Sequence, residues 1–583
     1  MRRLLLIVLL VCGPSVLAAE PDQQFEKIAA AYVDEFPAFS PVSATALGDH
    51  RFDSQLNHVS AEARAKWRAF ATQHLEQLKA IDRASLSRPN QVDYALLKHA
   101  LEASLWRAET LQEWAWNPLV YTELCGSAVY SLMARDFAPE PERLMHVADR
   151  LEQFPRLYEQ IRETLQPARV PRIHAETAIK QNRGVLSILK NMVRPRLGLL
   201  AVADRQRLLD AMKTASEAVE THQRWLETEM LPFAGGDFRI GAELYDKKLA
   251  FTLQSPLSRQ AIRERAESEL KRVRDEMYGI AKKVYQQRYP YTRFPANPDK
   301  PYRQALIRAA LEMAYEDVPP ADGIVAAAKE SMKVTTAFIE EKDLITLPPD
   351  PLEIIIMPEF QRGVSLAYCD SPGVLDVGQK TFYAVAPLPK SWTQKQIDSF
   401  VREYNIRSIH DLTIHEAMPG HFVQLAHSNR YPGKLRAVLS SGVFIEGWAV
   451  YTEQMMANQG FLDNDPLMRM IALKWYLRGI ANAILDQAVH TDGITRDQAM
   501  QLMMEDTFQE EREAAGKWVR AQLTSAQLST YFVGYIEHVD LRRETEAAWG
   551  DDFQLKTYHD KVLSFGSPPV KFARALLLDK AIP

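Results

Sequence analysis

The stretch HEAMPGH, residues 415–421, places a glutamate and two histidines in an order that is typical of zinc sites, but with an unusual spacing. In the common pattern HExxH the two histidines lie about 40° apart around a helix, so both face one metal ion. His415 and His421 are six residues apart, which corresponds to about 120° on a regular helix. A regular helix would therefore not bring both imidazoles to the same ion.

The residues between the two histidines predict a break in that helix. Pro419 lies four residues after His415, so it cannot donate the amide hydrogen that would bond the His415 carbonyl. Gly420 follows it and tolerates an unusual backbone conformation. A widened or broken turn of this kind is common at functional sites and would return His421 to the side of His415. The alternative is that both histidines are ordinary polar residues at a kinked helix.

A second segment, GVFIEGWAVYTEQM at residues 442–455, offers a third ligand. Glu446 lies in an apolar helix, where an unpaired charge is costly. Hydrolytic zinc sites generally have three protein ligands and one open position, so His415, His421 and Glu446 are predicted to bind one Zn²⁺ per chain. Glu453 lies about 10 Å further along the helix and is predicted to orient a ligand histidine.

Glu416 follows the first predicted ligand directly. A carboxylate next to the metal that does not bind it can accept a proton from water and pass it to a leaving group. Glu416 is therefore the predicted general base and general acid.

The composition indicates a globular, exported protein. The chain has 583 residues, of which 46% are hydrophobic and 25% charged, enough for a large core. Residues 1–19 have the two arginines, apolar run and small-residue end of a cleaved signal peptide. Cys12 lacks the small residue that a lipoprotein signal has just before its cysteine, so a soluble periplasmic or secreted protein is favoured over a lipid-anchored one.

The mature chain has 68 basic and 75 acidic residues, a net charge of −7, which argues against a nucleic-acid partner. No later apolar run of about 18 residues predicts a membrane span. Cys125 and Cys369 are the cysteines left after cleavage. Their spacing does not indicate a metal or redox site, and whether they form a disulfide stays open.

The dominant hydrophobic period is helical, and the predicted fold class is mainly α with one small β-sheet beside the metal site. Amphipathic helices are predicted at 60–81, 141–165 and 258–287. Strands are predicted at 352–360 and 380–389, separated by a loop.

The chain is predicted to consist of an N-terminal helical region, 20–345, and a catalytic region, 346–583, with a hinge near 345–353. The alternative is one continuous domain over 20–583.

The segments HEAMPGHFVQ and EGWAVYTEQM resemble the patterns HEAxPGHHxQ and EGWAxYxExL of a large bacterial family, domain of unknown function 885, which is distantly similar to zinc peptidases of the gluzincin type. Phe422 stands where the family usually has a further histidine. The resemblance extends over nearly the whole mature chain, and it implies a zincin-like helical fold and peptidase chemistry.

Further residues match family motifs, and roles for them follow from the resemblance. Tyr531 and His490 are the candidates to stabilise an oxyanion, with buried structural polar groups as the alternative. Asp486 is expected to support the metal ligands without binding the metal itself. Arg520 and Gln527 are expected to contact substrate. Ser525 and Ala526 replace the Pro-Gly of the family's turn near these residues. Separately, the strand-like KTFYAVAP, which contains Tyr383, could be an edge strand that pairs with an extended peptide.

The function that these patterns favour is zinc-dependent hydrolysis of peptide bonds in short peptides. The alternatives are a metal-dependent amidase that acts on cell-wall or other amides, and a non-catalytic peptide-binding protein, against which Glu416 argues. The sequence leaves open the oligomeric state and the choice between terminal and internal cleavage. Arg478, Arg520 and Arg542 are unranked candidates to hold a terminal carboxylate.

Overall fold

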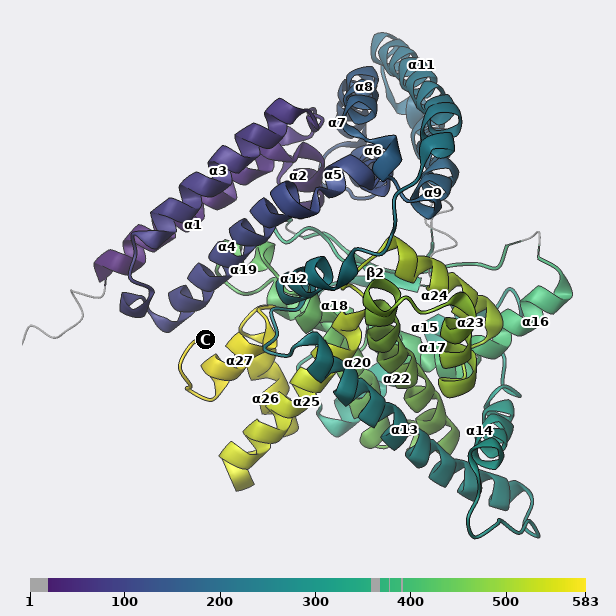
Figure 1. Ribbon diagram of the computed structural model, residues 1–583. Coiled ribbons are helices and arrows are strands. Elements are labelled where there is room, and N and C mark those ends of the chain that lie inside the picture. The colour runs from purple at the N-terminus through teal and green to yellow at the C-terminus, as the bar shows by residue number, and fades with distance from the viewer. Residues whose placement is uncertain (1–18, 358–366, 377, 390–391) are drawn as a thin grey trace, which may run out of the picture.

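The computed structural model describes residues 19–357, 367–376, 378–389 and 392–583. It is a mainly helical assembly with one small sheet, as predicted (Figure 1). The predicted signal peptide falls almost wholly on residues 1–18, which lie outside the described part. Within the described residues, no helix combines the length and apolar character needed to span a membrane.

The first helices form an elongated layer at one side of the molecule (Figure 1). They are α1 (Ala19–Glu35), α2 (Pro41–Leu47), α3 (Ala61–Lys79), α4 (Arg88–Trp106) and α5 (Glu113–Trp116). Ser60 begins α3 by accepting a hydrogen bond from the Ala63 N–H, the helix start that its serine predicts. The core of this layer, which includes Phe25, Phe70 and Leu97, also takes in Leu435 from the C-terminal part of the chain.

The next helices build a second bundle around its own core. They are α6 (Leu119–Met133), α7 (Glu140–Glu152), α8 (Phe154–Thr164), α9 (Arg172–Asn182), α10 (Gly184–Ile188) and α11 (Val202–Trp225). The single helix predicted over 141–165 is wrong, since α7 ends before α8 begins. Pro155 lies in the first turn of α8, where its missing N–H costs nothing, whereas inside one long helix it would remove a hydrogen bond.

The remaining helices surround the sheet and the predicted metal ligands. Those before the sheet are α12 (Gly241–Leu253), α13 (Arg259–Arg288), α14 (Lys300–Ala314) and α15 (Ile324–Lys342). Those after it are α16 (Gln394–Glu403), α17 (Ile406–Glu416), α18 (His421–Ser428), α19 (Lys434–Val438), α20 (Gly442–Asn458), α21 (Phe461–Asn464), α22 (Pro466–Gln487), α23 (Arg496–Gln501), α24 (Glu511–Leu523), α25 (Ser529–Trp549), α26 (Leu555–Leu563) and α27 (Val570–Leu577).

The hydrophobic cores extend across the predicted hinge near 345–353. One core joins Tyr245 and Met277 to Leu477. A second joins Ile339 to Trp448. The N-terminal helices α12 to α15 and the C-terminal helices therefore pack as neighbours around shared apolar side chains.

The sheet contains β1 (Leu352–Ile356), β2 (Ala367–Asp370) and β3 (Thr381–Val385) in the order β1–β3–β2. β3 pairs with β1 in parallel and with β2 antiparallel. The prediction that the strand containing Tyr383 is an edge strand is therefore wrong, because β3 is bonded on both sides. The four-residue β2 lies in the segment that was predicted to be a loop, and Met357 is the last described residue of the predicted strand 352–360.

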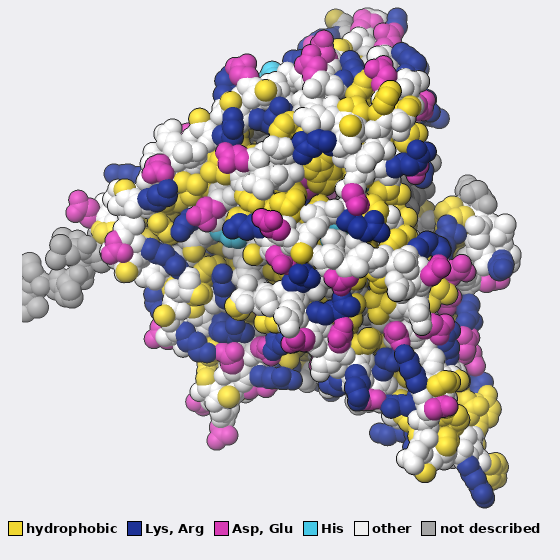
Figure 2. Space-filling model, in the orientation of Figure 1, with side chains coloured by type: hydrophobic (Ala, Val, Ile, Leu, Met, Phe, Trp, Pro, Cys, Tyr) yellow, Lys and Arg dark blue, Asp and Glu magenta, His cyan; other side chains and the backbone are white. Residues whose placement is uncertain are grey.

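On the face shown in Figure 2, acidic and basic side chains alternate over the whole surface. No large area of one sign is visible on this face, in agreement with the small net charge.

Candidate metal centre

The helix that carries His415 breaks before His421, as Pro419 and Gly420 predict. α17 ends at Glu416 and α18 begins at His421. The Met418–Pro419 peptide bond is cis, and the Gly420 N–H donates to the Ile414 carbonyl at 2.9 Å. A Cβ atom on Gly420 would lie 1.9 Å from the His415 carbonyl oxygen. Only glycine fits this close approach of the backbone to itself.

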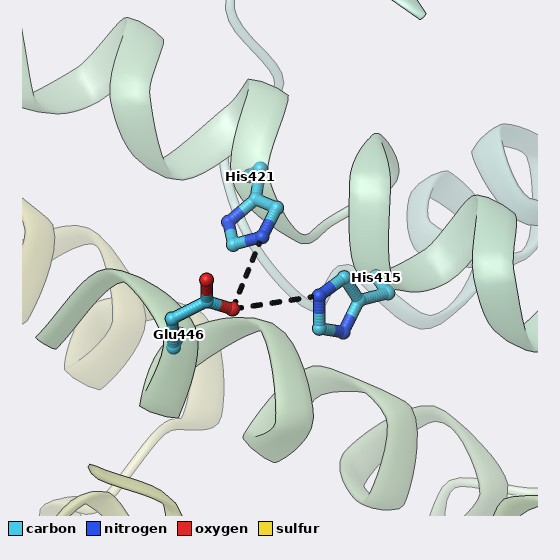
Figure 3. A group of neighbouring side chains, drawn as sticks. All are labelled: His415, His421 and Glu446. Atoms are coloured by element: carbon cyan, nitrogen blue, oxygen red, sulfur yellow. Dashed lines mark ion pairs between the residues drawn. The ribbon is translucent and has the colours of Figure 1, made fainter. Parts of the chain in front are cut away.

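Because of this break, His415 and His421 converge with Glu446 of α20, and the three side chains point toward one another (Figure 3). Glu446 Oε2 lies 3.7 Å from His415 Nε2 and 3.6 Å from His421 Nε2. All three potential ligand atoms lie within 4.8 Å of one another. Ligand atoms at about 2.0–2.2 Å from one tetrahedral zinc are about 3.3–3.6 Å apart. Glu446 Oε2 is buried without a hydrogen bond among the described residues, so a metal ion would satisfy it.

The ionisation of these residues also suits a metal. Burial and the charge of His421 lower the pKa of His415 to about 4. Burial opposes ionisation of Glu446, but the contact with His421 lowers the pKa of its carboxyl below the usual value. His415 is therefore neutral and Glu446 ionised near pH 7, the forms that coordinate a metal. Glu446 in turn raises the pKa of His421 against the effect of burial.

Two further glutamates lie beside the cluster. His415 Nδ1 is 2.6 Å from Glu453 Oε1, so its N–H can donate there and leave the Nε2 lone pair directed at Glu446. Glu416, at the end of α17, accepts a hydrogen bond from the Cys369 N–H of β2 at 2.9 Å. Burial raises the pKa of Glu416.

Tyr531, Arg520 and Gln527 form a connected group next to Glu446. Arg520 donates to Gln527 Oε1 at 2.9 Å and to the Tyr531 hydroxyl oxygen at 3.3 Å. The charges of Arg520 and Glu446 both influence the pKa of Tyr531, which burial raises. Since the Tyr531 oxygen accepts from Arg520, its own hydrogen is free to be donated in another direction.

The structure does not bring His490 and Asp486 to the metal cluster. His490 Nε2 lies 3.0 Å from the Ala521 carbonyl oxygen and 2.7 Å from that of Thr524. Asp486 accepts hydrogen bonds from the N–H groups of Ala526 and Ser529. The predicted oxyanion role of His490 and the support of the metal by Asp486 are therefore corrected: His490 Nε2 and the Asp486 carboxylate contact the end of α24 and the segment that leads into α25. His490 Nδ1 is buried without a hydrogen bond among the described residues.

Tyr383 is also not exposed to a substrate. Its side chain is fully buried, and its hydroxyl lies 3.3 Å from Thr413 Oγ1 of α17. It therefore packs the sheet against the helix that carries His415, and the substrate contact predicted for it is not supported by this geometry. Cys125 and Cys369 are both free thiols, so they form no disulfide with each other.

Two residues near the site were not predicted. Asp411 lies one turn before His415, is fully buried, and has no hydrogen bond to its carboxyl among the described residues. An acid in the apolar stretch IHDLTIHE is the same signal that identified Glu446, so it could have been found. Lys517 of α24 is also buried, with 6% of its surface exposed. Its burial could not have been predicted, because a lysine in the mixed polar and apolar segment EREAAGKWVRAQL is compatible with an exposed position.

The crossing of α20 and α25 fixes Glu446 relative to Tyr531. A Cβ on Gly447 would lie 2.3 Å from the Gly534 carbonyl carbon, and one on Gly534 would lie 2.1 Å from the Val443 oxygen. The two backbones touch at these glycines, each close to a residue of the site. Trp448 Nε1 donates to the Pro419 carbonyl at 3.0 Å and ties the crossing to the broken helix.

Gly447→Ala is expected to lower the free energy of unfolding by about 1–3 kcal/mol or more, because the added methyl group meets backbone that cannot rotate away. Urea unfolding of both proteins measures this difference. Gly442→Ala, in the first turn of the same helix, is the control, since nothing lies within 4 Å of its added Cβ. Equal stability of the two variants would contradict the close crossing.

The chain belongs to the family described as "Bacterial protein of unknown function (DUF885)", which it matches over residues 41–577. This confirms the family that the two motifs indicate. No curated protein matches the chain.

Two solved structures share the fold. A "putative lipoprotein of unknown function" from Shewanella oneidensis is 33% identical with a TM-score of 0.80, and the match covers 95% of this chain and 99% of that one. A "putative lipoprotein" from Colwellia psychrerythraea is 19% identical with a TM-score of 0.77 and the same coverage, 95% and 99%. The second likeness concerns the fold alone.

Proposed function

We propose that this protein is a zinc-dependent hydrolase of peptide bonds in short peptides. The convergence of His415 Nε2, His421 Nε2 and Glu446 Oε2 from three helices carries the proposal. Two histidines and a glutamate are a ligand set of zinc hydrolases, and they leave a position for water or substrate. A metal-binding helix beside a small sheet is also in keeping with a zincin-like fold, as the resemblance to gluzincins implies.

When bound, zinc supplies a Lewis acid that polarises the substrate carbonyl and makes water easier to deprotonate. Glu416 is the base that accepts the proton of the attacking water and then delivers it to the leaving nitrogen as the C–N bond breaks. Tyr531 donates a hydrogen bond to the oxygen that becomes negative, with Arg520 holding its hydroxyl in place. Glu453 keeps His415 in the orientation and tautomer needed for the ligand set.

The substrate backbone is proposed to lie along β2 instead of β3. In the order β1–β3–β2, β2 is bonded on one side only among the described strands. Its Cys369 N–H points to Glu416, so the open edge of β2 faces the proposed base. An extended peptide that adds to this edge would be carried past Glu416 and the metal ligands.

Export is part of the proposal. The signal-like segment 1–19 and the lipoprotein descriptions of the two structural relatives both support a location outside the cytoplasm. The relatives also make a lipid anchor an alternative to the soluble form that Cys12 and its neighbours favour.

Removal of zinc is expected to abolish peptide cleavage, and its return to restore it. Purified protein is treated with a chelator, dialysed, and incubated with a defined mixture of short peptides before and after addition of one equivalent of Zn²⁺. Mass spectrometry of the fragments locates each cleaved bond. Full cleavage by the chelated protein, or none by the zinc-loaded protein, would contradict the proposal. Protein heated to unfold it serves as the control for contaminating activity.

A further inference from the structure

Helix α24 presents a row of charged side chains toward the metal cluster. Glu513, Lys517 and Arg520 follow at i, i+4 and i+7, which places them on one face of the helix. The charges of Lys517 and Arg520 both act on Glu446, so this face looks toward the cluster. Arg478 of α22 forms an ion pair with Glu513 and so joins the row from another helix.

Among the described residues, Lys517 is the member of this row without a partner. Arg478 pairs with Glu513, and Arg520 donates to Gln527 and Tyr531. Within the described part of the chain, the Lys517 ammonium makes neither a hydrogen bond nor an ion pair, although the residue is only 6% exposed. Burial and repulsion from Arg478 hold the pKa of Lys517 well below its usual value. A buried amine in this position costs free energy until an anion pairs with it.

The charges of the row favour an anionic ligand. Its basic side chains are Arg478, Lys517 and Arg520, whereas Glu513 is its single acid and is already paired with Arg478. Glu446 faces His415 and His421 and would be shared with a metal ion. A carboxylate suits the remaining pair of cations, because its two oxygens can accept hydrogen bonds from an ammonium and a guanidinium together.

The geometry points to a carboxylate-binding subsite in which Lys517, with Arg520 beside it, holds a carboxylate of the substrate and directs hydrolysis to a bond near that group. This inference rests on the proposed function and specifies its substrate class. In a short peptide the carboxylate is either the C-terminal one or an acidic side chain. Arg542 is not part of this subsite, since it is bonded to Glu546.

Three peptides that differ only at the C-terminus test the inference with the zinc-loaded protein. The first ends in a free carboxylate, the second in an amide, and the third in a glutamate amide. The free acid is expected to be cleaved with a kcat/KM about 10 to 10² times that of the amide, the effect of losing one hydrogen bond to a charged group. Cleavage of the third peptide at the rate of the first shows that the subsite accepts either carboxylate, and cleavage at the rate of the second assigns the subsite to the C-terminal one. Faster cleavage of the third peptide than of both others assigns the subsite to a side-chain carboxylate.

Equal cleavage of all three peptides would overturn the inference and leave the proposed function intact. Cleavage of none would count against the proposed function itself. The comparison needs no variant, so it holds even if a substituted protein fails to fold.

Lys517→Met identifies the residue responsible. It is expected to lower kcat/KM for the free acid about 10- to 10²-fold and to leave the rate for the amide unchanged. Lys517→Arg should retain most of the preference, and Lys561→Met, at an exposed lysine, should retain all of it. Since the amine has no partner in the part of the chain that the structure describes, Lys517→Met should keep or raise Tm. A lowered Tm with equal loss on both peptides would show a structural role and overturn the assignment.

Discussion

Glu416→Gln is expected to lower the turnover of a peptide substrate by about 10²–10⁴, the usual contribution of a positioned general base. Glutamine keeps nearly the shape of the side chain but cannot accept the proton of the attacking water. The amide can still accept the hydrogen bond from the Cys369 N–H that holds the carboxylate in place, so the site should remain assembled. Zinc content and folding stability are expected to change little.

Kinetics, metal analysis and thermal unfolding of the same preparation check all three parts of this expectation. Glu537→Gln is a matched control, since it makes the same change at another buried glutamate, which accepts a hydrogen bond from Ser255. Near-normal hydrolysis by Glu416→Gln would assign the base to another carboxylate, with Glu453 the first to test, or place the activity at another site.

His415→Ala and Glu446→Ala are each expected to reduce bound zinc from about one per chain to a small fraction of that, and hydrolysis with it. Each substitution leaves two of the three protein ligands that a hydrolytic zinc site generally has. The loss should be visible by elemental analysis after dialysis against metal-free buffer, whether or not a substrate is known.

His427→Ala provides the control for removal of a histidine from the same region. His427 lies on α18, six residues after His421, and its Nε2 is 2.7 Å from the Thr346 carbonyl oxygen. The His427→Ala protein should therefore keep its full zinc content. Full zinc content in His415→Ala and Glu446→Ala as well would show that the cluster is not the metal site.

Features that depend on neighbouring residues could be predicted from the sequence. The serine starts of α3 and α13 follow from hydrogen bonds within one turn. The break between His415 and His421 follows from the missing amide hydrogen of Pro419 and the small size of Gly420. Glu446 was identifiable because a carboxylate in an apolar helix needs a partner. The structure places these residues together, while their binding of zinc stays a prediction.

Features that depend on contacts between distant residues were not predicted from the sequence, or were predicted wrongly. The position of β3 in the middle of the sheet depends on two pairings with separate segments, and the pattern of a buried strand is compatible with several strand orders. His490 matched a family motif, but its ring faces carbonyl oxygens at the end of α24 and just after it, more than 30 residues away in the chain. Sequence proximity to a motif does not specify which surface a side chain faces.

The candidate ligands, the candidate base beside them, and the broken turn that brings the two histidines together are predictable from the sequence, since each follows from chemistry and backbone geometry over a few residues. The packing of distant segments, in contrast, leaves one edge of β2 open among the described strands, next to Glu416, and brings Gly447 against Gly534. It also places Lys517 near Glu446, buried and without a partner among the described residues. Whether a lysine on a helix faces water or a metal site depends on packing between helices that are far apart in the chain, and no local pattern encodes it.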